Sequence, residues 1–418
     1  MGEEENISVV VATPLVRSQV VTLALLFLAG IVNFLDRSAL SIANGPIRQQ
    51  LHLSATSMGA LLSAFSLAYG FAQLPIGPLL DRAGAQRMLG AGLALWSTAT
   101  ALTGAVLGIR SFLALRVLLG LGEAPFFPAS LRIVREEFVP QQRGRAIATI
   151  NISTTLGQGI APPLLTLLLL RAGWRAMFAM IGGVGLLLAA AWLLLLRRES
   201  SVRTPPAPLA ETFAGWAALF RVPAIWGLML GFGGVNYTSW FFIAWLPAYL
   251  QTSRGISIKT SGWLAALPFL AGSLGMLLSG VLADRRVRGG AVVARVHRSQ
   301  VIVGMVLSAL STLLAIRAAS LAVAMACICG ALLFIHFAGT SAWGYVQAAS
   351  PRALVATVGS IQNFGSFMIA SAAPLLTGWI LDRTHAFAGS FLLCAVVALC
   401  GAASYILLVK DSLPLSEA

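Results

Sequence analysis

Long runs of apolar residues, separated by short polar segments, recur along the whole 418-residue chain. A helix needs about 20 apolar residues to cross the hydrocarbon core of a bilayer. The pattern therefore predicts an all-α membrane protein with twelve transmembrane helices. Their expected ranges are 18–43, 56–79, 86–107, 111–134, 143–170, 174–197, 223–250, 257–282, 298–317, 319–347, 353–381 and 386–410.

Composition agrees with this pattern and narrows the function classes. The chain is 58% hydrophobic and only 10% charged, whereas soluble domains carry about 25% charged residues. We expect a multi-pass integral membrane protein that lies in a lipid bilayer. The four cysteines lie inside apolar runs, and neither metal-ligand spacing nor a phosphate-binding loop is present in the sequence. We therefore expect no cofactor, no metal and no enzymatic activity.

One connection is longer and more polar than the others. Residues 198–222 include a cluster of three prolines and lie near the middle of the chain. This segment predicts a linker between two six-helix bundles, which would cover residues 1–197 and 223–418.

The positions of Lys and Arg predict the orientation. With the N-terminus in the cytoplasm, 18 of the 28 Lys and Arg residues fall in cytoplasmic segments and eight on the opposite side. This bias follows the positive-inside rule and predicts that both termini are cytoplasmic. The net charge of +14 is then mainly an orientation signal, so we expect no nucleic-acid partner.

The two halves repeat each other. "GPLLDR" at 77–82 returns as "GVLADR" at 280–285, and "PLLT" at 163–166 returns at 374–377. Both repeats fall in corresponding helices of the predicted halves, which indicates duplication of one six-helix unit.

Two parallel six-helix repeats and the segment "GPLLDRAGAQR" at 77–87 resemble the major facilitator superfamily. In that family, substrate sits between the halves, which rock to expose it alternately. The resemblance implies a cytoplasmic gate at the loop after the second helix of each half. Its residues here would be Gly77, Asp81, Arg82, Asp284 and Arg285.

Three further segments look like the anion:cation symporter branch of that superfamily. They are "FLDRSALSIA" at 34–43, "RVLLGLGEAPFFPA" at 116–129 and "WFFIAWLPAYL" at 240–250. This branch includes bacterial galactonate transporters and vesicular sialic acid and glutamate carriers. The resemblance implies a monomeric transporter of the bacterial inner membrane that couples uptake of a small organic anion, such as a sugar acid, to protons.

Four charged residues fall inside predicted spans: Asp36, Arg37, Arg116 and Glu123. Intramembrane charges are costly and usually mark a transport pathway. At 1.5 Å per residue, Asp36 and Arg116 lie at similar depths, about 12 and 9 Å from the outer ends of their helices. Glu123 follows Arg116 by seven residues and shares its helix face. We expect Asp36 and Glu123 to carry protons, with Arg116 as their switching partner; the alternative is a neutral network that only holds helices together.

Arg37 directly follows Asp36, so its side chain points about 100° away around the helix. If Asp36 faces Arg116, Arg37 can face the central cavity. The alternative is a second structural ion pair, for which the sequence offers no obvious spare acidic partner at that depth. A guanidinium in the cavity would bind the substrate's carboxylate in bidentate fashion.

A sugar acid also needs partners for its hydroxyl groups. Polar candidates in the predicted spans are Tyr69, Asn151, Thr154, Asn236, Tyr237, Thr340, Ser341, Trp343 and Asn363. The resemblance to galactonate transporters implies sugar contacts at Tyr69, Thr154, Thr340, Trp343 and Asn363. His336 is a further candidate for proton relay or anion binding, or it simply bonds to a backbone carbonyl.

Two positions depart from the galactonate pattern. Phe34 stands where those transporters carry tyrosine, and Thr154 stands where they carry glutamine. A substrate with fewer hydroxyls, or an aromatic or dicarboxylic acid, is therefore also compatible with the sequence. The main competing function is a proton-driven efflux antiporter; Gly159 and Pro162 lie close to, but not in, the pattern typical of such exporters.

Overall fold

The computed structural model describes residues 15–195, 218–351, 354–411 and 413. These residues form helices joined by short turns, and no strand occurs among them. The predicted all-α fold is confirmed. Most of the expected linker, 198–222, lies outside the described residues, so the domain boundaries stay a prediction.

Eight predicted spans are single helices. They are α1 (Arg17–Ile42), α3 (Ala55–Ala83), α4 (Ala85–Thr103), α9 (Pro223–Thr252), α10 (Ile258–Arg288), α11 (Val293–Arg317), α12 (Leu321–Ala349) and α15 (Ala388–Leu407). Two more spans are each broken into two helices. These pairs are α5 (Ile109–Glu123) with α6 (Phe126–Glu137), and α13 (Val355–Ala370) with α14 (Ala372–Thr384).

The remaining two spans run together as α7 (Pro140–Leu195). Gly173 interrupts this element with a φ of 76°, a conformation that glycine adopts without steric cost. The chain turns back there, between the predicted fifth and sixth spans. Within the described residues, nine elements are long and apolar enough to cross a membrane, one of them α7. The second half of α7, together with α4 and α9, completes the twelve spans expected from the sequence.

One short helix, α2 (Asn44–Gln50), was not expected. Its seven residues, NGPIRQQ, follow α1 after a single turn residue and are mostly polar. Seven residues are too few to show the periodic pattern from which a helix is predicted.

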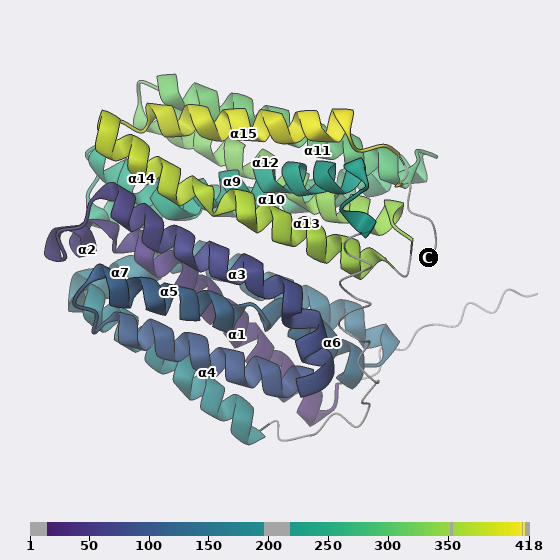
Figure 1. Cartoon of the computed structure of the whole chain (residues 1–418), viewed down its shortest axis with the longest axis horizontal. Helices are drawn as coiled ribbons and strands as arrows, with labels where there is room; N and C mark the ends of the chain where they lie inside the picture. The colour runs from purple at the N-terminus through teal and green to yellow at the C-terminus, as the bar shows by residue number, and fades with distance from the viewer. Residues whose placement is uncertain (1–14, 196–217, 352–353, 412, 414–418) are drawn as a thin grey trace, which may run out of the picture.

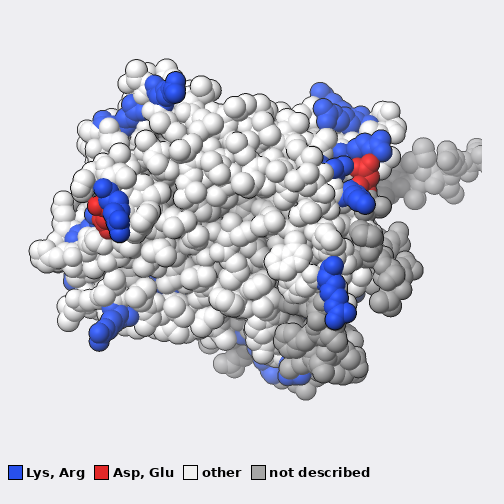
Figure 2. All heavy atoms as spheres, turned by 45° about the horizontal axis from the view of Figure 1, so that its top comes forward, with Lys and Arg blue, Asp and Glu red and all other residues white. Residues whose placement is uncertain are grey.

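The helices form two groups that lie side by side (Figure 1). One contains α1 to α7 and the other α9 to α15, with α3 of the first group packed along α13 and α14 of the second. Figure 2 shows Lys and Arg side chains gathered toward opposite ends of the molecule, with an uncharged band between them. This distribution suits a protein whose middle lies in lipid.

The halves share a hydrophobic core at the end away from the termini. Leu40 and Met58 of the first half pack there in one cluster with Phe241, Trp245 and Ala373 of the second. The core near the other end of the second half draws its residues from α9, α11, α12, α13 and α15 and the segments beside them. The halves are therefore joined by apolar packing at the end opposite the termini.

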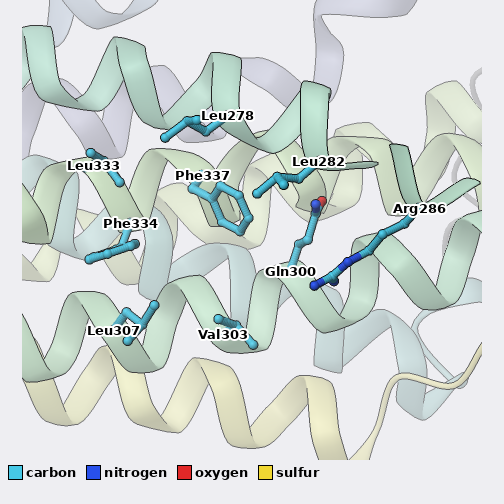
Figure 3. A pocket seen from close by; sticks show the side chains of 9 residues that line it. All are labelled: Leu278, Leu282, Arg286, Gln300, Val303, Leu307, Leu333, Phe334 and Phe337. Carbon is cyan, nitrogen blue, oxygen red and sulfur yellow. The ribbon is translucent and has the colours of Figure 1, made fainter. Parts of the chain in front are cut away.

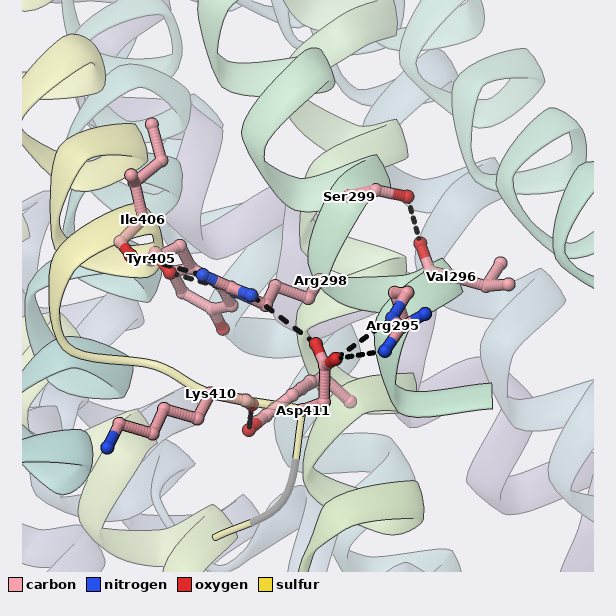
Figure 4. A network of polar contacts seen from close by, with 9 residues as sticks. Arg295, Val296, Arg298, Ser299, Tyr405, Ile406, Lys410 and Asp411 are labelled. Carbon is pink, nitrogen blue, oxygen red and sulfur yellow. Dashed lines mark hydrogen bonds and ion pairs between the residues drawn. The ribbon is translucent and has the colours of Figure 1, made fainter. Parts of the chain in front are cut away.

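The segment after α15 is tied back to α11 (Figure 4). Asp411 accepts hydrogen bonds from Arg295 Nε at 2.9 Å and Arg298 Nη1 at 3.3 Å. Arg298 also donates to the carbonyl oxygens of Tyr405 and Ile406. These bonds hold the pKa of the Asp411 carboxyl below its ordinary value, with the Arg295 bond as the main cause.

Candidate functional site

A buried ion pair joins α1 to α5. Arg37 Nε lies 2.7 Å from Glu123 Oε2, and the two side chains are 9% and 0% exposed. The expectation that Arg37 has no acidic partner at its depth is therefore wrong. Depth counted along a helix axis does not include the reach of a long arginine side chain, which here extends to the last residue of α5.

Asp36 is also buried, with 1% of the residue exposed. Neither of its carboxylate oxygens has a hydrogen-bond partner among the described residues. Its charged neighbours include Glu123, Arg116 and Arg37, and the hydroxyl of Thr100 on α4 lies beside it. Arg116 thus acts on Asp36 through its charge, without the direct hydrogen bond that a fixed pair would have.

Several polar atoms around these charges have no hydrogen-bond partner within the part of the chain that the structure describes. They include both amide atoms of Asn33, Glu123 Oε1, Arg37 Nη2, and Nε and Nη2 of Arg116. Buried polar atoms are normally paired. Two cations and two anions in close range, with spare donors and acceptors on each side, form a cluster in which one ion pair can be exchanged for another.

Aromatic rings enclose the Arg37 guanidinium. Its Cζ lies 4.9 Å from the Tyr69 ring centroid, 5.2 Å from that of Phe34 and 5.4 Å from that of Phe65. Such cation–π contacts stabilise a desolvated guanidinium. The predicted partner Tyr69 thus does lie beside Arg37.

Rings from the second half complete this enclosure. Trp240 of α9 lies 5.5 Å from Phe65 between ring centroids, and Phe367 of α13 lies 4.7 Å from Tyr69. We did not anticipate Phe65, Trp240 or Phe367, because apolar rings in membrane spans look like ordinary packing residues. The contact places the boundary between the two halves directly beside Arg37.

The described hydrogen bonds and ring contacts of the other predicted substrate residues do not involve the four charged residues of the cluster. On α9 and α13, Asn236 Nδ2 donates to Ser366 Oγ at 2.7 Å, and Ser366 Oγ donates to the Asn363 carbonyl oxygen at the same distance. Thr154 on α7 donates to the Asn151 carbonyl oxygen.

Three predicted residues have mainly local contacts on α12 or within the second half. Thr340 donates to the His336 carbonyl oxygen at 3.1 Å, and Trp343 packs edge-on against Phe232. Tyr237 is buried, and its hydroxyl has no partner among the residues that the structure describes. Their roles in binding stay predictions.

His336 packs tightly against α10. Its Nδ1 lies 2.9 Å from the Leu332 carbonyl oxygen. A Cβ on Gly272 would approach that nitrogen to 2.4 Å. This geometry favours the simpler of the two interpretations, a histidine that bonds to the backbone.

The predicted gate residues lie near the end that holds the termini. Asp81 at the end of α3 forms an ion pair with Arg132 of α6, which also pairs with Glu136. This partner belongs to the same half, so the pair links α3 to α6. A Cβ on Gly77 would meet no atom of the described residues within 4 Å. Arg82, Asp284 and Arg285 are exposed.

A contact at the opposite end was not foreseen. Asp382 of α14 accepts hydrogen bonds from the backbone N–H of Ala55 at 2.9 Å and of Thr56 at 2.7 Å, and from the Thr56 hydroxyl at 2.5 Å. A carboxylate at a helix N-terminus satisfies orphan N–H groups and complements the helix dipole. In this contact the carboxylate and the helix come from different halves. "GWILDR" at 378–383 repeats the pattern of "GPLLDR", a signal that would have identified Asp382.

Glycines bring the same two helices into backbone contact. A Cβ on Gly59 would meet the Pro374 carbonyl oxygen at 2.4 Å, and one on Gly378 would meet that of Ala55 at 2.2 Å. A side chain at either position would force the halves apart. The end of the molecule opposite the termini is closed by these contacts.

Comparison with known proteins agrees with the fold and with the class of function. Residues 26–372 match the sequence profile of the Major Facilitator Superfamily. The chain is 44% identical over 413 residues to a probable L-galactonate transporter of Escherichia coli (strain K12), covering 96% of this chain and 91% of that protein. It is 30% identical over 395 residues to a hexuronate transporter of Bacillus subtilis (strain 168), covering 92% and 93%.

Solved structures resemble the fold at lower identity. A bacterial homolog of the human lysosomal transporter Spinster superposes with a TM-score of 0.79 at 20% identity, covering 97% of this chain and 100% of that one. A D-xylose–proton symporter gives a TM-score of 0.76 at 15% identity, covering 94% and 98%. Both share the arrangement of helices described above.

Proposed function

This chain belongs to the major facilitator superfamily and is a membrane transporter, and we propose that it takes up a sugar acid together with protons by alternating access. The observation that carries this proposal is the buried Arg37–Glu123 pair beside the unpaired Asp36. The names of its sugar-acid-transporting relatives support the substrate class.

The ion pair couples anion binding to proton binding. While Glu123 is charged, it holds the Arg37 guanidinium at 2.7 Å. A substrate carboxylate that binds the Nε–Nη2 edge of Arg37 must compete with Glu123 for the Nε–H group. Protonation of Glu123 removes its charge and releases Arg37 to bind the substrate in bidentate fashion. Each ligand then raises the affinity for the other, because coupling free energies are reciprocal.

Asp36 provides the second proton site. A buried carboxylate without hydrogen bonds depends on nearby cations to remain charged. Arg116 and Arg37 supply that charge here. When Arg37 turns toward a substrate carboxylate, its support for Asp36 weakens, and Asp36 takes up a proton. After the substrate and the protons have left, Asp36 and Glu123 are both charged. Arg116 and Arg37 then balance these two negative charges.

The rings around Arg37 link this event to movement of the halves. Trp240 and Phe367 come from the second half and pack on Phe65 and Tyr69, which contact Arg37. A substrate that reaches Arg37 must displace this aromatic contact, and the contact re-forms when the substrate leaves. Closure at the Asp382 end supports a state in which substrate exchanges with the side of the termini.

The test is uptake of labelled acids into proteoliposomes under an imposed inward proton gradient. The panel contains L- and D-galactonate, a hexuronate, galactarate, a simple dicarboxylate and an aromatic acid. We expect gradient-driven accumulation of one sugar-acid class. Arg37→Lys keeps the charge but loses the planar fork, and we expect uptake to fall by about 10- to 100-fold.

Arg110→Lys is the matched control, because Arg110 is an exposed residue in the first turn of α5. It should leave uptake unchanged. If no acid in the panel accumulates while a neutral or cationic compound is expelled against its gradient, the chain is an exporter and the proposal is wrong.

A further inference from the structure

A groove of about 240 Å³ lies on the second half, away from the charge cluster. Helices α10 and α11 each pack along α12 but contact one another only slightly, which leaves α12 as the floor between two walls (Figure 3). The lining is almost entirely apolar. It includes Leu278, Leu282, Val303, Leu307, Phe334 and Phe337.

The groove opens toward the surface that faces lipid. Leu278 is 46% exposed and Val303 is 51% exposed. Both lie within membrane-spanning helices, so the solvent for these side chains is the hydrocarbon of the bilayer. An acyl chain is therefore the natural occupant of the groove.

One end of the groove carries an unpaired cation. Arg286 is in the last turn of α10, and its side chain extends across the mouth toward α11 beside Gln300 (Figure 3). Among the described residues, its guanidinium has no hydrogen bond or ion pair. The Gln300 amide is already occupied, because its oxygen accepts from Ser341 Oγ at 2.6 Å and its nitrogen lies 3.4 Å from the Ser279 carbonyl oxygen.

The neighbouring basic residues differ in this respect. Arg295 and Arg298 of α11 share Asp411, and Arg288 Nε donates to the Asp284 carbonyl oxygen at the end of its own helix. Within the described ranges, Arg286 is thus the cation that stands free at the groove. Basic residues beside apolar grooves on the cytoplasmic side are typical of sites for anionic lipid head groups.

We propose that this groove binds an anionic phospholipid, with one acyl chain between α10 and α11 and the phosphate paired with Arg286. Arg286 lies at the end of the molecule that holds the termini, which the Lys and Arg distribution predicts to be cytoplasmic. The lipid therefore belongs to the cytoplasmic leaflet. It would fix α10 against α11 without entering the transport pathway.

The test is lipid binding to the purified full chain, followed by native mass spectrometry with phosphatidylglycerol and phosphatidylcholine of identical acyl chains. We expect phosphatidylglycerol to bind about fivefold more tightly, the gain typical of one cation near a charged surface. Arg286→Gln should remove this preference, while Arg288→Gln should keep it. Val303→Trp fills the groove and should weaken both lipids.

Three results would overturn the proposal. One is equal binding of the two lipids to the unaltered protein. Another is loss of the preference in Arg288→Gln as large as in Arg286→Gln, which would indicate a diffuse basic surface. The third is competition by glycerol phosphate as effective as that by the intact lipid, which would indicate a site for a free anion. Unchanged sugar-acid uptake in Arg286→Gln checks that the variant is folded.

Discussion

Asp36 and Arg37 are neighbours in sequence but belong to different surroundings. The 100° between successive helix positions turns Arg37 toward Glu123 and the aromatic rings, and Asp36 toward Thr100 and Arg116. One short segment of α1 thus supplies a cation for an ion pair and an acid without a direct partner. The difference between them is what allows one to respond to an anion and the other to a proton.

The Arg37–Glu123 pair should behave as a unit in stability measurements. Removing one partner from a buried pair leaves a bare charge and costs about 3–5 kcal/mol, whereas replacing both is far less harmful. We expect Arg37→Met and Glu123→Gln each to lower the melting temperature of the detergent-purified protein. The double variant should be more stable than the sum of the two losses predicts.

Arg116 provides the comparison for this double-mutant measurement. It lies in the same helix as Glu123 and acts on it by charge, but among the described contacts no hydrogen bond joins the two residues. The coupling between Arg116→Met and Glu123→Gln should therefore be smaller. Strictly additive losses for Arg37 and Glu123 would show that the pair at 2.7 Å does not form in the membrane protein.

At the scale of elements, α3 and α14 form the joint between the halves at the end away from the termini. The joint combines backbone contact at Gly59 and Gly378 with the carboxylate of Asp382 at the first turn of α3. Apolar packing between α3 and α14 tolerates small shifts of one helix along the other. The hydrogen bonds of the Asp382 carboxylate fix the two helices in one relative position. The joint must open for substrate to enter from that side.

Asp382→Asn should shift the protein toward the state that is open at this end. Asparagine keeps one acceptor oxygen but loses the negative charge at the N-terminus of α3, which costs about 0.3–1 kcal/mol and changes the ratio of closed to open states by about 2- to 5-fold. The shift can be measured as longer distances between spin labels at Arg110 and Lys259, two exposed positions near the start of α5 and of α10. Thr384→Val is the control, since the Thr384 hydroxyl bonds to carbonyl groups of its own segment. An unchanged distance distribution in Asp382→Asn would mean that the cap does not hold this end closed.

The tether between α11 and the segment after α15 should be sensitive to acid. The pKa of Asp411 is lowered in the folded protein, so its stabilising effect is complete above the ordinary Asp value of about 3.9 and fades as the pH falls through the lower folded value. The pair is solvent-exposed and contributes under about 1 kcal/mol. We expect Asp411→Asn to lower the melting temperature slightly at pH 7 and 5, and by less at pH 3.

Ser299→Ala is the matched change for this test. Its hydroxyl donates to the Val296 carbonyl oxygen of the same helix and takes no part in the ion pair (Figure 4). The effect of Ser299→Ala should be the same at all three pH values. A difference between wild type and Asp411→Asn that grows in acid would contradict a lowered pKa at Asp411.

At the scale of the whole molecule, the apolar pattern was sufficient for the fold and insufficient for the site. Span length and the two repeated motifs predicted the helices, because a membrane span is defined by composition over about 20 residues. Which charged residues form ion pairs depends on the length of their side chains and on the direction in which each points from its helix. Counting residues along a helix gives only the depth and contains neither. For that reason the acidic partner of Arg37 was missed, and so were the rings of Trp240 and Phe367 from the other half.

The duplicated architecture also explains how distant events are linked. The charge cluster lies in the first half, while the rings over it and the carboxylate that caps α3 come from the second. A proton or an anion therefore binds in the first half, and its binding changes the contacts that this half makes with the second. Transport by alternating access requires such a division.

The most direct test of this account is proton movement that depends on substrate. Proteoliposomes with a pH-sensitive dye inside and no imposed pH difference receive an inward gradient of the sugar acid identified by the uptake panel. We predict that the lumen acidifies as the acid enters. In Glu123→Gln the labelled acid should still exchange across the membrane, while fewer protons enter with each acid molecule, because Asp36 is then the one proton carrier left in the charge cluster. Entry of the acid into wild-type vesicles at a constant internal pH would contradict proton coupling through Glu123 and Asp36.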